Sequence, residues 1–342
     1  MRTLSIGNEK IGPGQKPLII AEIGTNYGTD LDVATAMVDA AAASGADAAK
    51  FQTHHATHEM VETEMADLGY ADLYNRIGSY EMSVTEHREL QKQCEAGDMM
   101  FLSTPFSVEA VDTLEKVGVP AYKIGSGELT NYQLLKRVAD TGKPLLISTG
   151  MVEWETIKEA VSFVKNHTNQ FALLYCVSEY PTNATDFNLG MINKMKNQFD
   201  VPVGFSDHSQ GIEAAVIAMA QGADFVEKHF TLDRRLPHGD QEVSIEPNEL
   251  AELTEYAELI DQTRGTERRI RAAEESIRGW AHHSVVTTDS ISSGSTLTTD
   301  NITTKRPGTG IPASRYFDLI GSTATRSLSS DTILTEDDIH IS

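Results

Sequence analysis

The feature that most constrains the fold is the regular alternation of short apolar segments with helix-like segments from residue 17 to residue 263. Near-continuous apolar strands separated by helices indicate a parallel sheet that is covered on both faces. Eight such units predict one closed (β/α)8 barrel, the TIM barrel, with its active site at the C-terminal ends of the strands. The expected strands lie at residues 17–24, 48–53, 99–106, 121–127, 144–150, 171–181, 201–209 and 223–230. Helical patterns occur at residues 31–43, 85–96, 108–117, 156–165, 212–221 and 246–263.

The turn after the first expected strand separates a closed barrel from an open sheet. An open, doubly wound sheet favours a G-x-G-x-x-G turn, whereas residues 24–28 read Gly-Thr-Asn-Tyr-Gly. The fingerprint is absent, so the sequence favours the closed barrel. The connection from Thr53 to Ser83 is too long for a simple barrel loop, and we expect it to cap the mouth.

The composition divides the chain into a large and a small domain. We expect the barrel at residues 1–265, a polar linker at 266–281 and a small β-rich domain at 282–342. Within the small domain, residues 289–302 resemble residues 326–339. The aligned apolar pairs are Leu297 with Leu334 and Ile302 with Ile339. A module of about sixty residues is marginally stable alone, so we expect it to pack on a barrel, that of another subunit being one arrangement.

Charge and cysteine content narrow the class of protein. The formal net charge is −22, which opposes binding to nucleic acid or to an anionic membrane surface. Cys94 and Cys176 lie far apart in the sequence and indicate reduced thiols. No apolar stretch approaches the roughly 20 residues of a membrane-spanning helix, and the N-terminus lacks the features of a secretory signal. We therefore expect a cytoplasmic protein.

Two lysines in apolar strands point to an anionic substrate. Lys50 and Lys123 lie inside otherwise apolar segments, where an unpaired ammonium group is costly and a phosphate or carboxylate would satisfy it. Pairing with a barrel carboxylate such as Glu22 or Glu128 is the alternative for each lysine taken alone. Their place at adjacent strand ends favours an anion site. Four strand-end hydroxyls would add neutral donors: Thr104, Ser126, Ser148 and Ser206.

Two histidines at neighbouring strand ends suggest a metal site. His208 and His229 end the last two strands, with Asp207, Glu227 and Asp240 nearby in the sequence, so their imidazoles can converge on one divalent ion. A single strand-end histidine is more often structural. Two histidines completed by water and substrate oxygens favour Mn²⁺, with Co²⁺ or Mg²⁺ as alternatives, over structural zinc.

Glu22 and Arg306 are two further candidates. Glu22 ends the first strand, where a carboxylate near lysines and a metal can be tuned for proton transfer. A structural pair with Lys50 or Lys123 is its competing role. Arg306 precedes a Pro-Gly bend that could present its guanidinium group rigidly, and an ordinary turn is the alternative.

Eight short stretches, taken in order, resemble the sialic acid synthase (N-acylneuraminate or nonulosonic acid synthase) family with its C-terminal antifreeze-like (SAF) domain. The resemblance covers nearly the whole chain, and the ordered set is specific although each motif alone is weak. The stretches are AEIGTNYG, KFQTH, FLSTPF, YKIGSGE, LISTGM, GFSDHS, VEKHF and KRPGTGI.

The resemblance implies condensation of phosphoenolpyruvate with an N-acylated mannosamine-type sugar, giving a nine-carbon 2-keto sugar acid and phosphate. It implies catalytic roles for Glu22, Lys50 and Lys123 and metal ligation by His208 and His229. Phosphoenolpyruvate would be held by Lys50, Thr104, Lys123, Ser126, Ser148 and Ser206. The sugar side would be formed by Gln52, Glu128, Ser178, Tyr180 and Asp240. Arg306 would reach this site from the partner's small domain in a domain-swapped homodimer.

The sequence leaves the acceptor sugar and two other functions open. Ser178 and Glu179 occupy a stretch where some relatives have Asn and an apolar residue, and residues 56–80 do not clearly reproduce the family's amide-recognising segment. N-acetylmannosamine is the favoured acceptor, with a legionaminic or pseudaminic acid synthase as the alternative. Another phosphoenolpyruvate-aldose synthase or a metal-dependent aldolase would not use Arg306. A non-enzymatic function, with the tail as an ice- or sugar-binding module and the barrel as its scaffold, is the other alternative. The Thr residues of the tail do not form the regular array of ice-binding surfaces, and this function would not explain Lys50 and Lys123.

Overall fold

The chain divides into two compact units, Met1–Arg264 and Gly265–Ser342. The computed structural model describes residues 3–237 and 239–340. No helix among these residues is both long enough and apolar enough to span a membrane.

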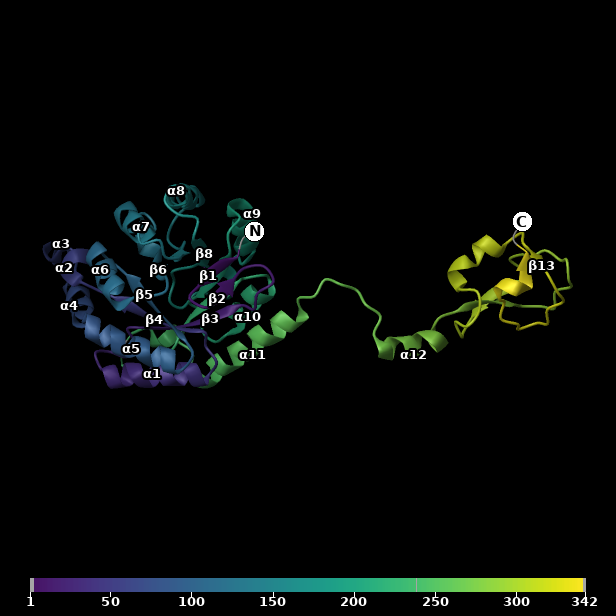
Figure 1. Ribbon diagram of the computed structural model, residues 1–342, viewed down its shortest axis with the longest axis horizontal. Coiled ribbons are helices and arrows are strands. Elements are labelled where there is room, and N and C mark those ends of the chain that lie inside the picture. Colours follow the sequence, from purple (N-terminus) through teal and green to yellow (C-terminus); the bar gives the residue numbers. More distant parts are fainter. Residues whose placement is uncertain (1–2, 238, 341–342) are drawn as a thin grey trace. The chain divides into compact units, whose positions relative to one another are not determined.

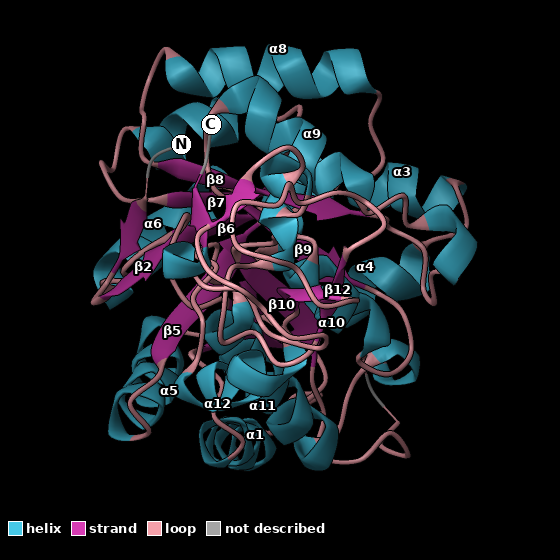
Figure 2. Ribbon diagram, turned by 90° about the vertical axis from the view of Figure 1, so that its right-hand side faces the viewer, coloured by secondary structure: helices cyan, strands magenta, loops and turns pink. Residues whose placement is uncertain are grey.

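The first unit is a barrel of eight parallel strands in the order β5-β4-β3-β10-β9-β8-β7-β6. β5 and β6, at the two ends of this order, also lie against each other. The sheet is therefore nearly closed, which confirms the predicted TIM barrel, and helices surround it (Figures 1 and 2). The strands are β3 Leu18–Gly24, β4 Ala48–Thr53, β5 Met100–Pro105, β6 Tyr122–Ile124, β7 Leu145–Ser148, β8 Phe171–Cys176, β9 Val203–Asp207 and β10 Phe225–His229.

Side chains alternate between the inside and the outside of the barrel because successive residues of a strand point to opposite faces. Ile20, Leu102 and Phe225 belong to one buried cluster inside the lower part of the barrel. Gly204 makes room there, since an added Cβ would lie 2.7 Å from the Phe225 ring. The intervening residues of the strands pack outward against the helices in a second, larger cluster.

The helices start and stop where local chemistry dictates. Asp30 caps the N-terminus of α1 (Leu31–Ala43), and its carboxylate accepts the N–H groups of Asp32 and Val33. α5 begins with a capping box between Ser83 and Glu86. The helices that follow strands are α1 Leu31–Ala43, α5 Val84–Ala96, α6 Val108–Val117, α7 Tyr132–Ala139, α8 Trp154–Lys165, α9 Gly190–Phe199, α10 Glu213–Ala220 and α11 Pro247–Thr263.

The long connection between β4 and α5 is helical rather than irregular. It contains α2 Ala56–Glu59, α3 Glu62–Asp67 and α4 Ala71–Ser79. Its first residues stay at the mouth, because His54 and Glu59 form a hydrogen-bonded chain with Gln52 of β4.

An antiparallel hairpin that the sequence analysis did not anticipate precedes the barrel. It consists of β1 Leu4–Ile6 and β2 Glu9–Ile11. Leu4, Ile6 and Ile11 are buried in the same cluster as the lower barrel interior, whereas Lys10 is exposed. The hairpin therefore seals the N-terminal end of the barrel.

The second unit contains α12 Ala272–Ala281 and a small β-rich module. Its strands are β11 Ser284–Thr287, β12 Ile302–Lys305, β13 Thr323–Ala324 and β14 Ile339–His340. The two sequence repeats contribute equivalent residues to one core: Leu297 and Leu334, and Ile302 and Ile339, are all buried in it. The repeat is thus a repeat of core positions.

The hairpin seal can be tested by truncating one of its buried side chains. We expect Ile11→Ala to lower the free energy of unfolding by about 2–5 kcal/mol, because it leaves a cavity under the barrel. The control Lys10→Ala, on the same strand but exposed, should change it by no more than about 0.5 kcal/mol. Urea unfolding followed by circular dichroism measures both, and equal midpoints would contradict the role of the hairpin.

Candidate active site

The predicted strand-end side chains meet in one cavity of about 270 Å³ at the C-terminal mouth of the barrel. The same alternation that fills the lower barrel with apolar groups turns polar groups inward here. The predicted residues that line the cavity are Glu22, Lys50, Gln52, Thr104, Lys123, Ser126, Ser148, Ser178, Tyr180, Ser206, His208 and His229.

Two lysines and two glutamates form a buried charge cluster on the floor of this cavity. Lys50 Nζ lies 2.7 Å from Glu22 Oε2 and 3.7 Å from Glu227 Oε2. Lys123 Nζ lies 3.5 Å from Glu227 Oε1. Each lysine therefore has a carboxylate partner, as the alternative of pairing within the barrel required. The two positive and two negative charges of the cluster balance one another.

Burial acts differently on the four groups. It raises the pKa of the Glu22 carboxyl to about 7, because desolvation outweighs the attraction of the Lys50 ammonium group. Burial also lowers the pKa of Lys123, although Glu227 opposes this shift. For Lys50, the attraction of Glu22 and Glu227 overcomes desolvation and raises its pKa. Glu22 is thus the carboxyl group that is poised to exchange a proton near neutral pH.

Hydroxyl groups surround the two ammonium groups. Lys50 donates to Thr104 Oγ1 at 3.1 Å, and Lys123 donates to Ser148 Oγ at 2.7 Å. Ser206 Oγ donates to Glu227 Oε1 at 3.3 Å. Ser126 Oγ accepts the backbone N–H of Gly150 at 3.1 Å. The floor of the cavity therefore offers several N–H and O–H donors close together, which suits an oxyanion.

The two lysines do not lie on adjacent strands, contrary to the expectation from the sequence. β5 lies between β4 and β6 in the closed sheet. Lys50 and Lys123 converge because both point inward and both approach Glu227.

The imidazoles of His208, just after β9, and His229, at the end of β10, lie side by side with ring centroids 5.4 Å apart. His208 Nδ1 lies 2.7 Å from the carbonyl oxygen of Val177 and must donate to it. When the ring is neutral, His208 Nε2 keeps its lone pair and accepts the Tyr180 hydroxyl at 2.8 Å.

Comparison with known proteins assigns the family. The chain matches the NeuB family over residues 37–269. This chain belongs to the NeuB family. It also matches the SAF domain over residues 282–340. An uncharacterized protein of Methanocaldococcus jannaschii is 40% identical, over 94% of this chain and 93% of that protein.

Two further relatives carry functional names. The N,N'-diacetyllegionaminic acid synthase of Campylobacter jejuni is 35% identical, over 94% of this chain and 100% of that protein. A crystal structure of N-acetylneuraminic acid (sialic acid) synthetase from Leptospira borgpetersenii, in complex with citrate, is 36% identical. It superposes with a TM-score of 0.75 over 81% of this chain and 95% of that chain. The family and the enzyme class expected from the motifs, a phosphoenolpyruvate-dependent nonulosonic acid synthase, are confirmed.

NeuB enzymes are generally metal-dependent, and the imidazole wall fits a divalent ion. His229 Nδ1 is buried without a hydrogen-bond partner among the described residues and lies 3.6 Å from Asp240 Oδ2. Burial, reinforced by the positive charge of nearby groups, lowers the pKa of His229 well below its usual value, so the ring is neutral, as metal binding requires. The described residues contain no cluster of three or more His, Cys, Asp or Glu side chains that would hold a metal alone. Water or substrate oxygens would have to complete the coordination.

Asp207, expected beside the imidazoles, belongs to a different part of this NeuB barrel. It forms a fully buried ion pair with Lys228 at 3.2 Å, and its carboxylate accepts the N–H and O–H groups of Ser209. Asp207 and Lys228 alternate with the inward-facing residues of β9 and β10. Their side chains therefore point outward, away from the barrel interior. Their pair stabilises the wall of the barrel and lies outside the cavity.

Three predicted residues lie outside the cavity lining. Glu128 is half-buried and accepts the Asn131 amide at 2.7 Å. Asp240 is partly exposed beside His229. Arg306 belongs to the second unit, where Nε donates to the carbonyl oxygen of Ala281 at 3.0 Å.

Several lining residues were not predicted from the sequence, among them Glu227 as the bridging carboxylate, Phe106, Met151 and Cys176. The signal for Glu227 was available. It lies two residues before His229 on a strand, so both side chains must face the same side.

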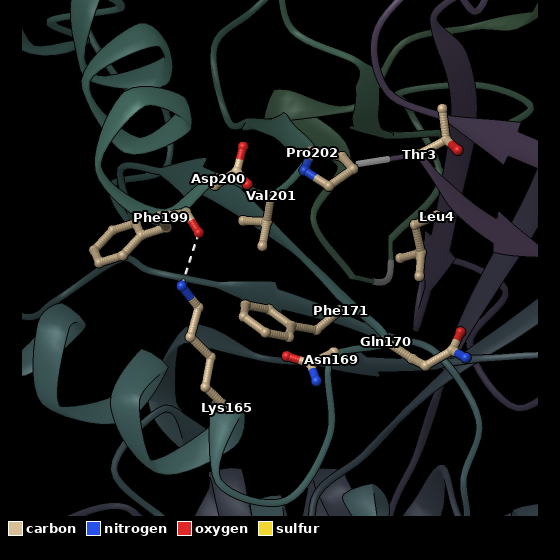
Figure 3. A pocket seen from close by; sticks show the side chains of 10 residues that line it. All are labelled: Thr3, Leu4, Lys165, Asn169, Gln170, Phe171, Phe199, Asp200, Val201 and Pro202. Atoms are coloured by element: carbon tan, nitrogen blue, oxygen red, sulfur yellow. Dashed lines mark hydrogen bonds between the residues drawn. The ribbon is translucent and has the colours of Figure 1, made fainter. Parts of the chain in front are cut away.

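A second cavity, of about 350 Å³, lies at the other end of the barrel (Figure 3). It is lined by Leu4 of the hairpin, Phe171 and Pro202 at the starts of β8 and β9, and Lys165, which donates to the carbonyl oxygen of Phe199 at 2.8 Å. In TIM barrels this face serves stability. The cavity at the mouth is therefore the candidate active site.

The outward pair can be tested through stability. We expect Lys228→Met to lower the free energy of unfolding by about 3–5 kcal/mol, because the Asp207 carboxylate remains buried without its counter-charge. The double variant Asp207→Asn, Lys228→Met should recover most of this loss. Lys158→Met, which removes an exposed pair with Glu155 on α8, is the control and should change little. Equal losses in the single and double variants, measured by urea unfolding, would rule out a buried pair.

Proposed function

We propose that this chain is a cytoplasmic N-acylneuraminate synthase that condenses phosphoenolpyruvate with N-acetylmannosamine or a related N-acylated aldose. The products would be a nine-carbon 2-keto sugar acid and inorganic phosphate. The observation that carries the proposal is the shared cavity, in which the lysine cluster and the imidazole pair face the same space.

The charge balance of the floor supports phosphoenolpyruvate as the anionic substrate. The ammonium groups of Lys50 and Lys123 are balanced by Glu22 and Glu227. Protonation of Glu22, whose pKa is about 7, would leave one net positive charge for the incoming anion. The hydroxyls of Thr104, Ser126, Ser148 and Ser206 would then complete the contacts to its carboxylate and phosphate oxygens.

The reaction requires one carbon–carbon bond to form and one carbon–oxygen bond to break. The enol carbon of phosphoenolpyruvate attacks the aldehyde carbon of the sugar, and the aldehyde oxygen takes up a proton. Water adds to the resulting oxocarbenium-like carbon, forming a new C–O bond, and loses one proton. The C–O bond to phosphate then breaks, and the remaining hydroxyl proton passes to the departing phosphate as the keto group forms. In our assignment protonated Glu22 first gives its proton to the aldehyde oxygen, and the resulting carboxylate then stabilises the cationic carbon by its negative charge.

His208 and His229 would hold the divalent ion on the acceptor side, with Mn²⁺ as the favoured ion and Co²⁺ or Mg²⁺ as alternatives. When bound, the ion supplies Lewis-acid polarisation of the sugar aldehyde. Tyr180 would have to release His208 Nε2 first, because its hydroxyl now occupies the lone pair that binds metal. The carbonyl of Val177 would keep the imidazole oriented throughout.

The acceptor sugar is assigned to the upper part of the cavity, where Gln52, Ser178 and Tyr180 line the wall and Glu128 and Asp240 lie nearby. A legionaminic or pseudaminic acid synthase is the second candidate, supported by the similarity to the Campylobacter jejuni legionaminic acid synthase. In a domain-swapped homodimer, Arg306 of the partner subunit would complete this acceptor site. Its guanidinium group is oriented over the Trp280 ring, 5.5 Å from the centroid.

An activity assay tests the reaction and the acceptor together. We expect the purified protein with phosphoenolpyruvate and Mn²⁺ to release phosphate and a 2-keto acid in equal amounts, with N-acetylmannosamine the best acceptor in a panel of N-acyl hexosamines. The panel should include 2,4-diacetamido sugars, and a preference for these would support the second candidate. Turnover of aldoses without an N-acyl group at the same rate would favour another synthase of the same barrel. No turnover with any acceptor would refute the proposal.

The metal assignment predicts a binding defect as well as a loss of activity. We expect His208→Ala to lose Mn²⁺ binding at least tenfold, since one of two protein ligands is gone, and to lose Mn²⁺-dependent turnover. Electron paramagnetic resonance of free Mn²⁺ measures binding without substrate. His167→Ala, at an exposed histidine on the same unit, is the control and should bind Mn²⁺ like the unmodified protein. Unchanged Mn²⁺ binding by His208→Ala would contradict the assignment of His208 as a metal ligand.

A further inference from the structure

A chain of hydrogen bonds leads from the charge cluster into the connection that follows β4. Glu22 Oε1 accepts the Gln52 side-chain N–H at 3.2 Å. Gln52 Oε1 lies 3.0 Å from His54 Nε2, and His54 Nδ1 lies 2.9 Å from Glu59 Oε2. His54 and Glu59 are buried, with 4% and 8% of their side chains exposed. The chain is therefore shielded from water.

While Glu22 is ionised, the order of donors and acceptors determines which His54 nitrogens carry a proton. A carboxylate only accepts hydrogen bonds, so Gln52 must turn its NH₂ group toward Glu22 when that residue is paired with Lys50. The Gln52 carbonyl oxygen then faces His54 Nε2, which must carry a proton. Glu59 is also an acceptor, so His54 Nδ1 must carry a proton as well. A ring with both nitrogens protonated is an imidazolium cation.

The surroundings of His54 suit a cation. Its ring stacks on Phe106, with centroids 4.4 Å apart and planes 14° from parallel, and the face of an aromatic ring attracts positive charge. The second oxygen of Glu59 accepts the backbone N–H of His55, which fixes the carboxylate against the imidazolium.

The backbone conformation at Gly24 leaves space for the hydrogen bond between the side chains of Glu22 and Gln52. A register irregularity between Glu22 and Gly24 interrupts the pairing of β3 with β4. Gly24 has a φ of +54°, and an added Cβ would lie 3.1 Å from Glu22 Oε1 and 3.3 Å from Gln52 Nε2. Glycine at this position leaves the two side chains room to meet.

We propose that His54 is a positioning residue that, as an imidazolium cation, holds the Gln52 amide in one orientation. With its carbonyl oxygen bound by His54, Gln52 can offer the acceptor sugar an N–H donor, so it selects an acceptor oxygen at that point of the cavity. This proposal rests on the proposed synthase function. His54 itself is separated from the cavity by Gln52 and Phe106, both of which line it.

A double-mutant cycle tests whether His54 acts through Gln52. We expect His54→Phe, which keeps an aromatic ring for Phe106 but donates no hydrogen bond, to lower kcat/KM for the acceptor about tenfold, the value of one hydrogen bond. KM for phosphoenolpyruvate should stay the same. In a Gln52→Ala background, His54→Phe should have no further effect, because the group that it orients is gone. Losses that multiply in the double variant would overturn the proposal.

His55→Phe is the matched control for this cycle. His55 is the next residue along the chain, and its Nε2 bonds Thr113 rather than Gln52. We expect it to leave kcat/KM unchanged, and unfolding midpoints recorded for all variants separate loss of folding from loss of orientation. A loss in His55→Phe equal to that in His54→Phe would indicate a general packing effect and overturn the proposal.

Nitrogen-15 NMR of the histidine-labelled protein tests the imidazolium without substrate or turnover. We expect one ring, absent from the spectrum of His54→Phe, to show two protonated nitrogens at a pH above 7, where Glu22 is ionised, and Glu59→Gln to abolish this signature. A signal from one unprotonated nitrogen in the His54 ring would refute the proposal even in an active enzyme. An enzyme that is inactive with every acceptor would refute the synthase function, and the NMR result would still decide the state of His54.

Discussion

The structure depends on the alternation of side chains along eight parallel strands that close on one another. Closure gives each strand one face toward a common interior and one toward the helices. The interior is therefore a single column whose chemistry changes from bottom to top. Apolar residues such as Ile20 and Phe225 fill its lower part, and Lys50, Lys123 and Glu227 occupy the upper part. The lower packing supports the buried charges above it.

Four buried charges at one point are costly unless each has a partner. Glu22 and Glu227 meet this requirement for the two lysines, so the cluster is balanced by its own residues. The burial that makes these pairs necessary also raises the pKa of Glu22 to about 7, against the attraction of Lys50. Stability and proton transfer therefore depend on the same contacts, and the chain of Gln52 and His54 extends this balance into the neighbouring connection.

The sequence predicted the barrel and most of the cavity lining because both follow from strand position. The alternation of side chains along a strand also predicts that Asp207 and Lys228 point outward and that Glu227 points inward. The N-terminal hairpin escaped prediction because strands of three residues carry almost no periodic signal. The chain through His54 could not be predicted either, because it requires the three-dimensional approach of residues from β3, β4 and α2.

The first barrel strand, β3, pairs on one side with the last one, β10, in the register Leu18 with Phe225. A nascent chain therefore emerges with one edge of β3 unpaired and must wait for almost the whole barrel to be synthesised before that edge is covered. Until then, the edge could pair with a strand of another chain. Synthesis speed and chaperone protection during this interval, rather than the stability of the finished barrel, would then set the yield of folded enzyme.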